Sequence, residues 1–190
     1  MSRWTFPMLC LLSTAAFATP VEDFRNSWNY EALAHQRTLE MGEPLGQTSF
    51  QYTHNSYNSV AYQNLGSYWD PNHQVSVVDQ LDLGIRALEL DVHWAYSKLI
   101  LCHGTSDHTG CSTFDRHFED GIKEIATWLE RPENNDQVIL IYIEEHVDSE
   151  HDRAVDILDL HLGDRIYRPG SCRTLPMDIT RADMINDGKQ

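Results

Sequence analysis

The sequence predicts an α/β fold whose parallel sheet forms the first half of a TIM-type (β/α)8 barrel. Two observations predict it. Short apolar runs typical of strands alternate with segments typical of amphipathic helices, and the residues able to carry chemistry stand where these strands end. A complete barrel needs about 250 residues, whereas this chain has 190. We therefore expect about four β/α units, arranged as an open half-barrel.

The first 18 residues have the composition of a secretory signal peptide. Arg3 supplies a short basic start, and residues 4–18 are apolar but too few to span a bilayer. Residues 16–18 (Ala-Phe-Ala) match a small-x-small cleavage site. We predict that residues 1–18 are removed and that the mature protein is secreted or periplasmic.

The remaining elements are expected in a regular order. Residues 19–45 read as a polar lead-in with helical character over 21–41, and residues 46–190 as the barrel portion. Clusters of Gly, Pro, Asn and Asp separate the later elements. Strands are predicted over 48–53, 85–92, 98–102 and 137–143, and helices over 76–83, 114–129, 148–162 and 179–185.

Two of these elements have the strongest patterns. In the segment 114–129, apolar residues recur at spacings of three and four and make one helical face: Phe118, Ile122, Ile125 and Leu129. The run 137–143 (QVILIYI) is almost wholly apolar, as expected of a strand covered on both faces. No glycine-rich turn of the nucleotide-binding type follows any strand, which disfavours a dinucleotide-binding fold.

The chain is strongly acidic, with a formal net charge of −15 at pH 7. This charge argues against a nucleic-acid partner, because phosphates need basic side chains. It also limits any contact with an anionic membrane surface to a transient one. Acidity of this kind keeps an exported protein soluble.

The cysteines allow two interpretations. Cys102 and Cys111 stand nine residues apart, and a disulfide between them would leave Cys172 over. The alternative is a zinc site made by this pair together with His103 and His108, although the spacing matches no standard structural zinc pattern.

Two histidines follow predicted strands directly. His54 ends the first strand and His103 ends the third. If these strands are neighbours, both imidazoles face one pocket. Cleavage of a phosphodiester needs a proton removed from the attacking hydroxyl, charge relief at the phosphoryl oxygens and a proton for the leaving group. Two histidines and a metal ion meet these needs.

Oxygen ligands for such an ion stand nearby. Glu89 and Asp91 are two residues apart on a predicted strand and so share a face, while Asn55 and Glu144 follow other strands. Carboxylate and amide oxygens suit Ca²⁺, with Mg²⁺ as a second possibility. The structural alternative is a pair of rim acids that cap helices or pair with Arg86.

In these motifs the segment 44–147 resembles the catalytic X-region of phosphatidylinositol-specific phospholipase C, most closely its secreted, calcium-dependent microbial branch. The resemblance covers a little over half of the chain. The matching stretches are 53–57 (THNSY), 80–86 (QLDLGIR), 88–93 (LELDVH), 102–104 (CHG) and 143–146 (IEEH). The stretches 53–57 and 88–93 in this order are fairly specific for the family. The stretches 102–104 and 143–146 are weak indicators on their own.

The resemblance implies roles for the site residues. His54 would act at the phosphoryl centre, and His103 would be general acid toward the leaving group and later base. Calcium would be held by Asn55, Glu89, Asp91 and Glu144. Family members without calcium use an arginine in place of the metal, so the carboxylates here favour the metal-dependent branch. The implied products from phosphatidylinositol are a cyclic inositol phosphate and diacylglycerol.

Three functions therefore stand beside one another. The first is a calcium-dependent phosphodiesterase acting on a phosphoinositide or on a soluble glycerophosphodiester such as glycerophosphoinositol. The second is a glycerophosphodiester phosphodiesterase, in which the first histidine usually precedes Arg-Gly, whereas His54 precedes Asn-Ser. The third is a non-catalytic, calcium-binding exported relative. The sequence leaves the oligomeric state open.

Overall fold

The computed structural model describes residues 19–170 and 175–190. The predicted signal peptide and Cys172 lie outside these ranges. Four strands form one sheet: β1 (Tyr52–Thr53), β2 (Ala87–Ala95), β3 (Lys98–Leu101) and β4 (Leu140–His146). The helices are α1 (Pro20–Arg25), α2 (Trp28–Leu39), α3 (Val77–Asp82), α4 (Phe118–Leu129), α5 (His151–His161) and α6 (Arg181–Asn186).

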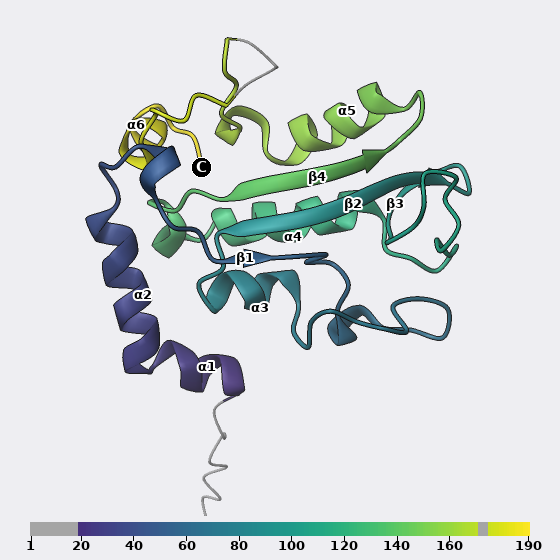
Figure 1. Cartoon of the computed structure of the whole chain (residues 1–190), viewed down its shortest axis with the longest axis horizontal. Helices are drawn as coiled ribbons and strands as arrows, with labels where there is room; N and C mark the ends of the chain where they lie inside the picture. Colours follow the sequence, from purple (N-terminus) through teal and green to yellow (C-terminus); the bar gives the residue numbers. More distant parts are fainter. Residues whose placement is uncertain (1–18, 171–174) are drawn as a thin grey trace, which may run out of the picture.

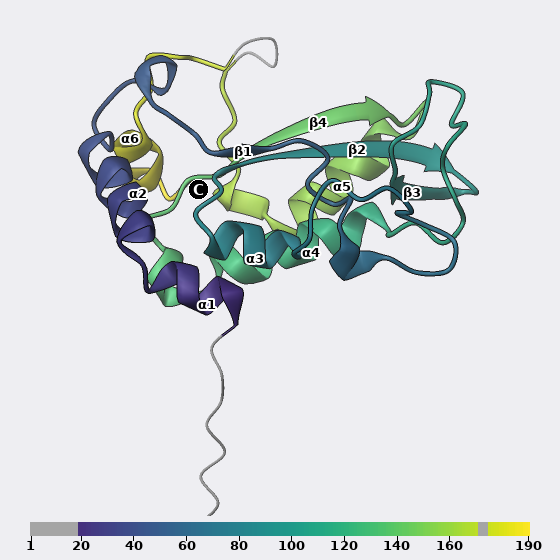
Figure 2. The ribbon, with the colours of Figure 1, turned by 60° about the horizontal axis from the view of Figure 1, so that its bottom comes forward.

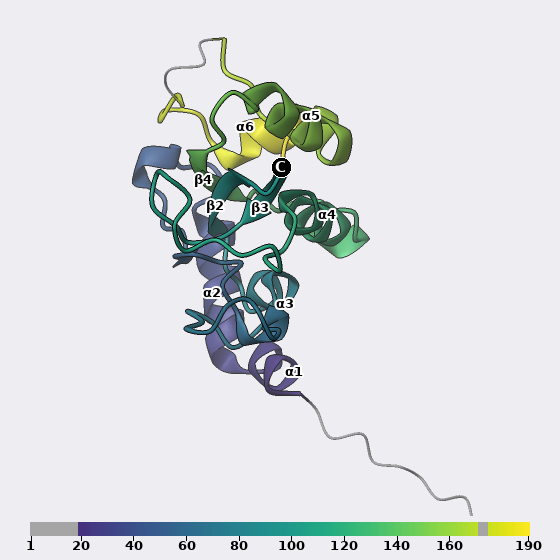
Figure 3. The ribbon, with the colours of Figure 1, turned by 90° about the vertical axis from the view of Figure 1, so that its right-hand side faces the viewer.

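The central strand is β2, which pairs in parallel with β1 on one side and with β4 on the other (Figure 1). Its register places Leu88 beside Ile141 and Asp91 beside Glu144. Helices α3, α4 and α5 lie against one face of this sheet (Figure 2). Seen from one end of the strands, the sheet is a single layer that does not close on itself (Figure 3). The α/β class is confirmed, but the described strands form an open sheet and not a TIM-type barrel.

The third strand departs from the predicted β/α order because β3 runs antiparallel to β2. The two strands are joined by Tyr96 and Ser97, whose φ angles are 53° and 59°. Two successive positive φ angles define the tight hairpin turn that reverses a chain with the correct twist. The segment 98–102 therefore returns along β2, and the expectation of four successive β/α units was wrong here.

The helix layer packs on the alternate residues of β2 that face it. Leu88, Leu90 and Val92 are fully buried in one apolar cluster with the helix residues. The predicted apolar face of α4 joins the same cluster: Phe118, Ile122, Ile125 and Leu129 are all buried. Periodicity in the sequence therefore identified the main core correctly.

The lead-in segment packs against the last helix. The 19–45 region contains α1 and α2, separated at Ser27, whose hydroxyl accepts a hydrogen bond from the Tyr30 amide and so starts α2. Buried Arg181, at the start of α6, donates to the Arg37 carbonyl at the end of α2. Figure 1 shows α6 close to this end of α2. No described helix is long and apolar enough to cross a membrane.

Candidate active site

The face of β2 opposite the helices is as buried as the core but is polar. Glu89 is 4% exposed, Asp91 2% and His93 0%. These side chains alternate with the apolar residues of the strand, as the two-residue repeat of a strand requires. Two carboxylates and an imidazole on one buried strip are costly unless they are paired or hold a ligand.

Pairing with β4 completes an acidic cluster. Because Asp91 lies beside Glu144, carboxylate oxygens of Glu89, Asp91 and Glu144 come within 4.8 Å of one another. Burial raises the pKa of Asp91, and the nearby charge of Glu144 raises it further. Arg86, the partner in the structural alternative, instead donates to Gln137 and to backbone carbonyls. Among the described residues, no lysine or arginine forms an ion pair with the three acids.

Asn55 joins this cluster from the loop after β1. It is 3% exposed and has a left-handed backbone, with φ 49°, a conformation that asparagine adopts more readily than most residues. Its amide oxygen faces the Asp91 carboxylate, while its amide nitrogen lies 3.4 Å from the His103 Nδ1 atom. Turning the amide over would instead let its nitrogen donate to both Asp91 oxygens, at 3.0 and 3.2 Å. Without a cation the reversed orientation satisfies both groups, whereas an amide oxygen turned toward Asp91 would need a shared cation.

The two predicted histidines flank the acids from the solvent side. The His54 Nε2 atom is 3.7 Å from Glu89 Oε2, and its side chain is 59% exposed. The His103 Nδ1 atom is 3.0 Å from Asp91 Oδ2, with the side chain 69% exposed. Each imidazole is therefore held near one carboxylate and remains open to a substrate.

His103 reaches the site by a route that the sequence did not predict. Since β3 runs back along β2, with Leu101 beside Val92, the residue after the strand returns to the middle of β2. The Cys102 amide accordingly donates to the Asp91 carbonyl, at 3.3 Å. A parallel third strand would have carried His103 to the sheet edge; the hairpin brings it to Asp91 instead.

Sequence reasoning missed two tyrosines that bond to the acids. The Tyr57 hydroxyl donates to Asp91 Oδ2 at 3.2 Å, and the Tyr52 hydroxyl donates to Glu89. Burial comes first among the causes that raise the pKa of both hydroxyls, so both stay protonated donors. The available signal was their position, because each lies within three residues of His54 or Asn55 at the end of the first strand.

A second layer of histidines lies behind the acids. His93 stacks on His146, with ring centroids 4.5 Å apart, and its Nδ1 atom is 3.1 Å from His108 Nδ1. Burial, with the neighbouring imidazoles, lowers the pKa of His93 to about 4, so this ring is neutral. The His93 side chain is fully buried.

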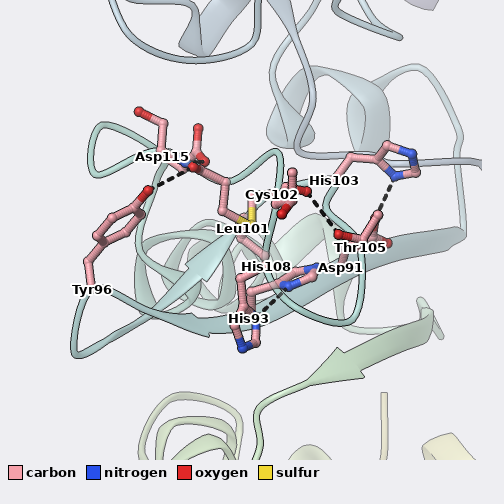
Figure 4. Close-up of a disulfide and its surroundings, with 12 residues drawn as sticks. Asp91, His93, Tyr96, Leu101, Cys102, His103, Thr105, His108 and Asp115 are labelled. Atoms are coloured by element: carbon pink, nitrogen blue, oxygen red, sulfur yellow. Dashed lines mark hydrogen bonds and ion pairs between the residues drawn. A yellow bond between two sulfur atoms is a disulfide. The ribbon is translucent and has the colours of Figure 1, made fainter.

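The cysteine pair lies next to this layer. Cys102 and Cys111 form a disulfide with Cα atoms 5.4 Å apart, which is one of the two interpretations that the sequence left open (Figure 4). His103 faces Asp91, and the zinc set that included it is not assembled. The disulfide closes the loop that begins with His103, so it fixes the backbone on either side of this imidazole.

A cavity of about 490 Å³ opens beside the two histidines. Asp115 in its wall is 6% exposed, and burial raises the pKa of this carboxyl to about 6. No lysine or arginine of the described residues lines the cavity. Its other lining residues come mostly from the loops after β1 and β3 and include His54, Asn55, Asn58, Tyr68, Trp69 and His103.

Comparison with known proteins gives a consistent result. The model of the family described as the Rv2075c PI-PLC-like domain matches residues 10–190. The chain is also similar to two uncharacterized proteins of Mycobacterium tuberculosis, Rv2075c of strain ATCC 25618 / H37Rv and MT2135 of strain CDC 1551 / Oshkosh. Each is 31% identical over 205 residues, an alignment that covers 94% of this chain and 42% of the relative. The chain thus spans less than half the length of these curated relatives.

Proposed function

The chain belongs to the Rv2075c PI-PLC-like domain family, and on this premise we propose that it is a calcium-dependent phosphodiesterase of the phosphatidylinositol-specific phospholipase C type. One observation carries the proposal: three carboxylates gather within 4.8 Å, and the two exposed imidazoles beside them border one cavity. A phosphodiesterase-type function follows from the family. The calcium dependence and the inositol substrate are proposed from the site.

The donor set fits a hard divalent cation. Glu89, Asp91 and Glu144 offer carboxylate oxygens, and the Asn55 amide beside Asp91 would add its oxygen in the orientation that turns that oxygen toward the acids. Because no described lysine or arginine lines the cavity, the described part of the chain offers no fixed positive charge to a phosphate there. Bound Ca²⁺ would supply that charge and lower the pKa of the attacking hydroxyl. Mg²⁺ takes the same oxygen ligands but demands stricter octahedral geometry.

The histidines divide the proton transfers. In the first step, an inositol hydroxyl next to the phosphodiester attacks phosphorus, and His54 accepts its proton. The bond from phosphorus to the leaving oxygen breaks, and His103 donates a proton to that oxygen. Asp91 accepts a hydrogen bond from Nδ1 of His103, which fixes the tautomer and leaves Nε2 to face the cavity. The product is a cyclic inositol phosphate, which water opens when the two histidines exchange roles.

A turnover assay tests the proposal. The chain is incubated with phosphatidylinositol or with glycerophosphoinositol, each with calcium or with a chelator. We expect calcium-dependent release of a cyclic inositol phosphate. His103→Ala should lower turnover by about 10² to 10⁴-fold, the usual contribution of a general acid. His35→Ala, an exposed histidine on α2, is the matched control and should retain full activity.

The products separate the alternatives. A soluble substrate is favoured by the net charge of −15, which opposes binding to an anionic bilayer. Preference for glycerophosphoinositol with a cyclic product would keep the mechanism and replace the lipid. Free glycerol 3-phosphate would indicate a glycerophosphodiester phosphodiesterase. Calcium binding without turnover of either substrate would overturn the enzymatic proposal in favour of a non-catalytic relative.

A further inference from the structure

The disulfide and the buried histidines behind the acids form a second group of metal-binding side chains. One ring nitrogen of His93 and the sulfurs of Cys102 and Cys111 all lie within 4.8 Å of one another. His93 is fully buried, and its Nε2 atom has no hydrogen-bond partner among the described residues. Nothing in the proposed phosphodiester chemistry uses these three side chains.

His108 supplies a fourth ligand from the same loop. Its Nδ1 atom is 3.1 Å from the Nδ1 atom of His93 (Figure 4). Two nitrogens bound to one zinc at about 2.1 Å each must lie within about 4.2 Å of one another, so this separation suits a shared ion. In the oxidised chain one imidazole can donate its Nδ1 proton to the other, and a metal ion placed between the rings would replace that proton.

We propose that, when the disulfide is reduced, Cys102, Cys111, His93 and His108 bind one Zn²⁺ ion in a tetrahedral Cys2His2 site. The four ligands come from β2 and from the loop that starts at the end of β3, so the ion would tie this loop to β2, whereas the disulfide closes the loop on itself. The site differs from the zinc set considered from the sequence alone, because His93 replaces His103. His103 stays with Asp91.

Conversion of the disulfide form into the zinc form requires a reductant, which can be a thiol or a phosphine. The reductant gives two electrons to the sulfur–sulfur bond, which breaks, and two protons from solvent complete the two thiols. Zn²⁺ then displaces both thiol protons, because only thiolates bind the metal well. The oxidised form suits an exported compartment and the zinc form a reducing one. The two metal sites stay distinct, since thiolate and imidazole select zinc whereas carboxylates select calcium.

Metal binding by the reduced chain tests this site without any activity assay. The chain carries Cys10→Ser and Cys172→Ser, so that Cys102 and Cys111 are the only thiols. After reduction by a phosphine without oxygen, Co²⁺ serves as the spectroscopic probe, and Zn²⁺ is then titrated to displace it. We expect one equivalent of Co²⁺ with thiolate-to-cobalt charge-transfer absorption, full displacement by one equivalent of Zn²⁺ and no effect of excess Ca²⁺. The oxidised chain should show no such absorption.

Matched variants identify the ligands. His108→Ala, in a largely surface loop, should weaken zinc binding by at least about tenfold, the scale of loss seen when even a supporting partner of a metal ligand is removed. His103→Ala should leave the affinity unchanged. Free thiols that bind neither metal would overturn the proposal, as would binding that persists when both cysteines are serine. If reduction unfolds the chain, recovery of its circular dichroism on adding Zn²⁺ supports the site, and failure to recover rejects it.

Discussion

The two faces of β2 are equally buried and chemically opposite. Leu88, Leu90 and Val92 face the helices and belong to the main apolar cluster, whereas Glu89, Asp91 and His93 face the other way. On the first face, burial itself stabilises the fold. On the second, burial removes water from charged groups and works against the fold. The same strand therefore contains both the main stabilising surface and the acids of the candidate site.

Burial therefore has a different cause on each face of β2. Apolar burial on β2 needs no explanation beyond packing, and it could be exchanged for similar side chains at modest cost. Buried carboxylates without a lysine or arginine partner need a ligand, a proton or a protonated histidine to account for them. Stability measurements on variants of the two faces should therefore respond in opposite directions, and the predictions below test that contrast in order of expected size.

The largest effect is expected on the apolar face. Leu90→Ala removes a fully buried side chain next to α4 and should lower the free energy of unfolding by about 2–5 kcal/mol, because a cavity remains. Urea denaturation followed by circular dichroism measures this loss. Leu160→Ala, at an exposed leucine of α5, is the control and should change stability little. Equal losses at both positions would contradict the assignment of the helix-facing side as the core.

The next effect concerns a buried carboxyl away from β2. The pKa of Asp115 is raised from its ordinary value of 3.8 to about 6, because burial disfavours the charge. The folded state then holds this proton more tightly than the unfolded state, so its stabilising contribution is complete below about pH 4 and is lost as the pH rises through about 6. The loss is at most about 3 kcal/mol. Urea midpoints of the metal-free chain should therefore fall over this window relative to Asp115→Asn, and parallel profiles would contradict the prediction.

Bound calcium should offset the destabilisation that the buried acids of β2 cause. An ion bound only to the folded chain raises the free energy of unfolding by about 2.7 kcal/mol when its concentration is 100 times the dissociation constant. Glu144→Gln should remove most of this gain. The adjacent Glu145→Gln is the matched control, because alternation along β4 directs it to the opposite face of the sheet. Thermal unfolding with calcium and with chelator measures the stabilisation by calcium in each variant. Loss of this stabilisation in Glu145→Gln would count against the site.

The same contrast explains what the sequence predicts well and poorly. Regular patterns identified the helix-facing core, since Phe118, Ile122 and Ile125 recur at helical spacing and all are buried. Alternation likewise placed Glu89 and Asp91 on one face. These inferences succeed because they depend on local periodicity, which the chain carries within a few residues.

The direction of β3, the bounds of β4 and the burial of His93 could not be predicted from the sequence, because they depend on contacts between different segments. The direction of β3 depends on the backbone at Tyr96 and Ser97, which carry no glycine or asparagine signal for a tight turn. The apolar run that suggested a strand over 137–143 begins pairing at Leu140 and continues to His146, because β2 offers a partner that far. The His93 ring is covered by His108 of the loop after β3 and by His146 of β4, and neither lies beside it in the sequence.

The smallest effect is the sharpest test of the polar face. Burial raises the pKa of Asp91, so its ionised form destabilises the metal-free fold above the ordinary carboxyl pKa of about 4. Asp91→Asn keeps the shape and still accepts the hydrogen bond from the Tyr57 hydroxyl. The variant in chelator should therefore be more stable than the natural chain at pH 7, and the difference should vanish below about pH 4.

Urea denaturation at the two pH values measures this gain, with Asp156→Asn, an exposed acid of α5, as the control that should show none. The same variant must also lose calcium binding, since it removes one of the three clustered carboxylates. A gain in metal-free stability joined to a loss of calcium affinity is the signature of a residue kept for its ligand. If Asp91→Asn instead destabilised the metal-free chain, the carboxylate would be a structural partner of Tyr57 and His103, and the distinction between the two faces would fail at its central residue.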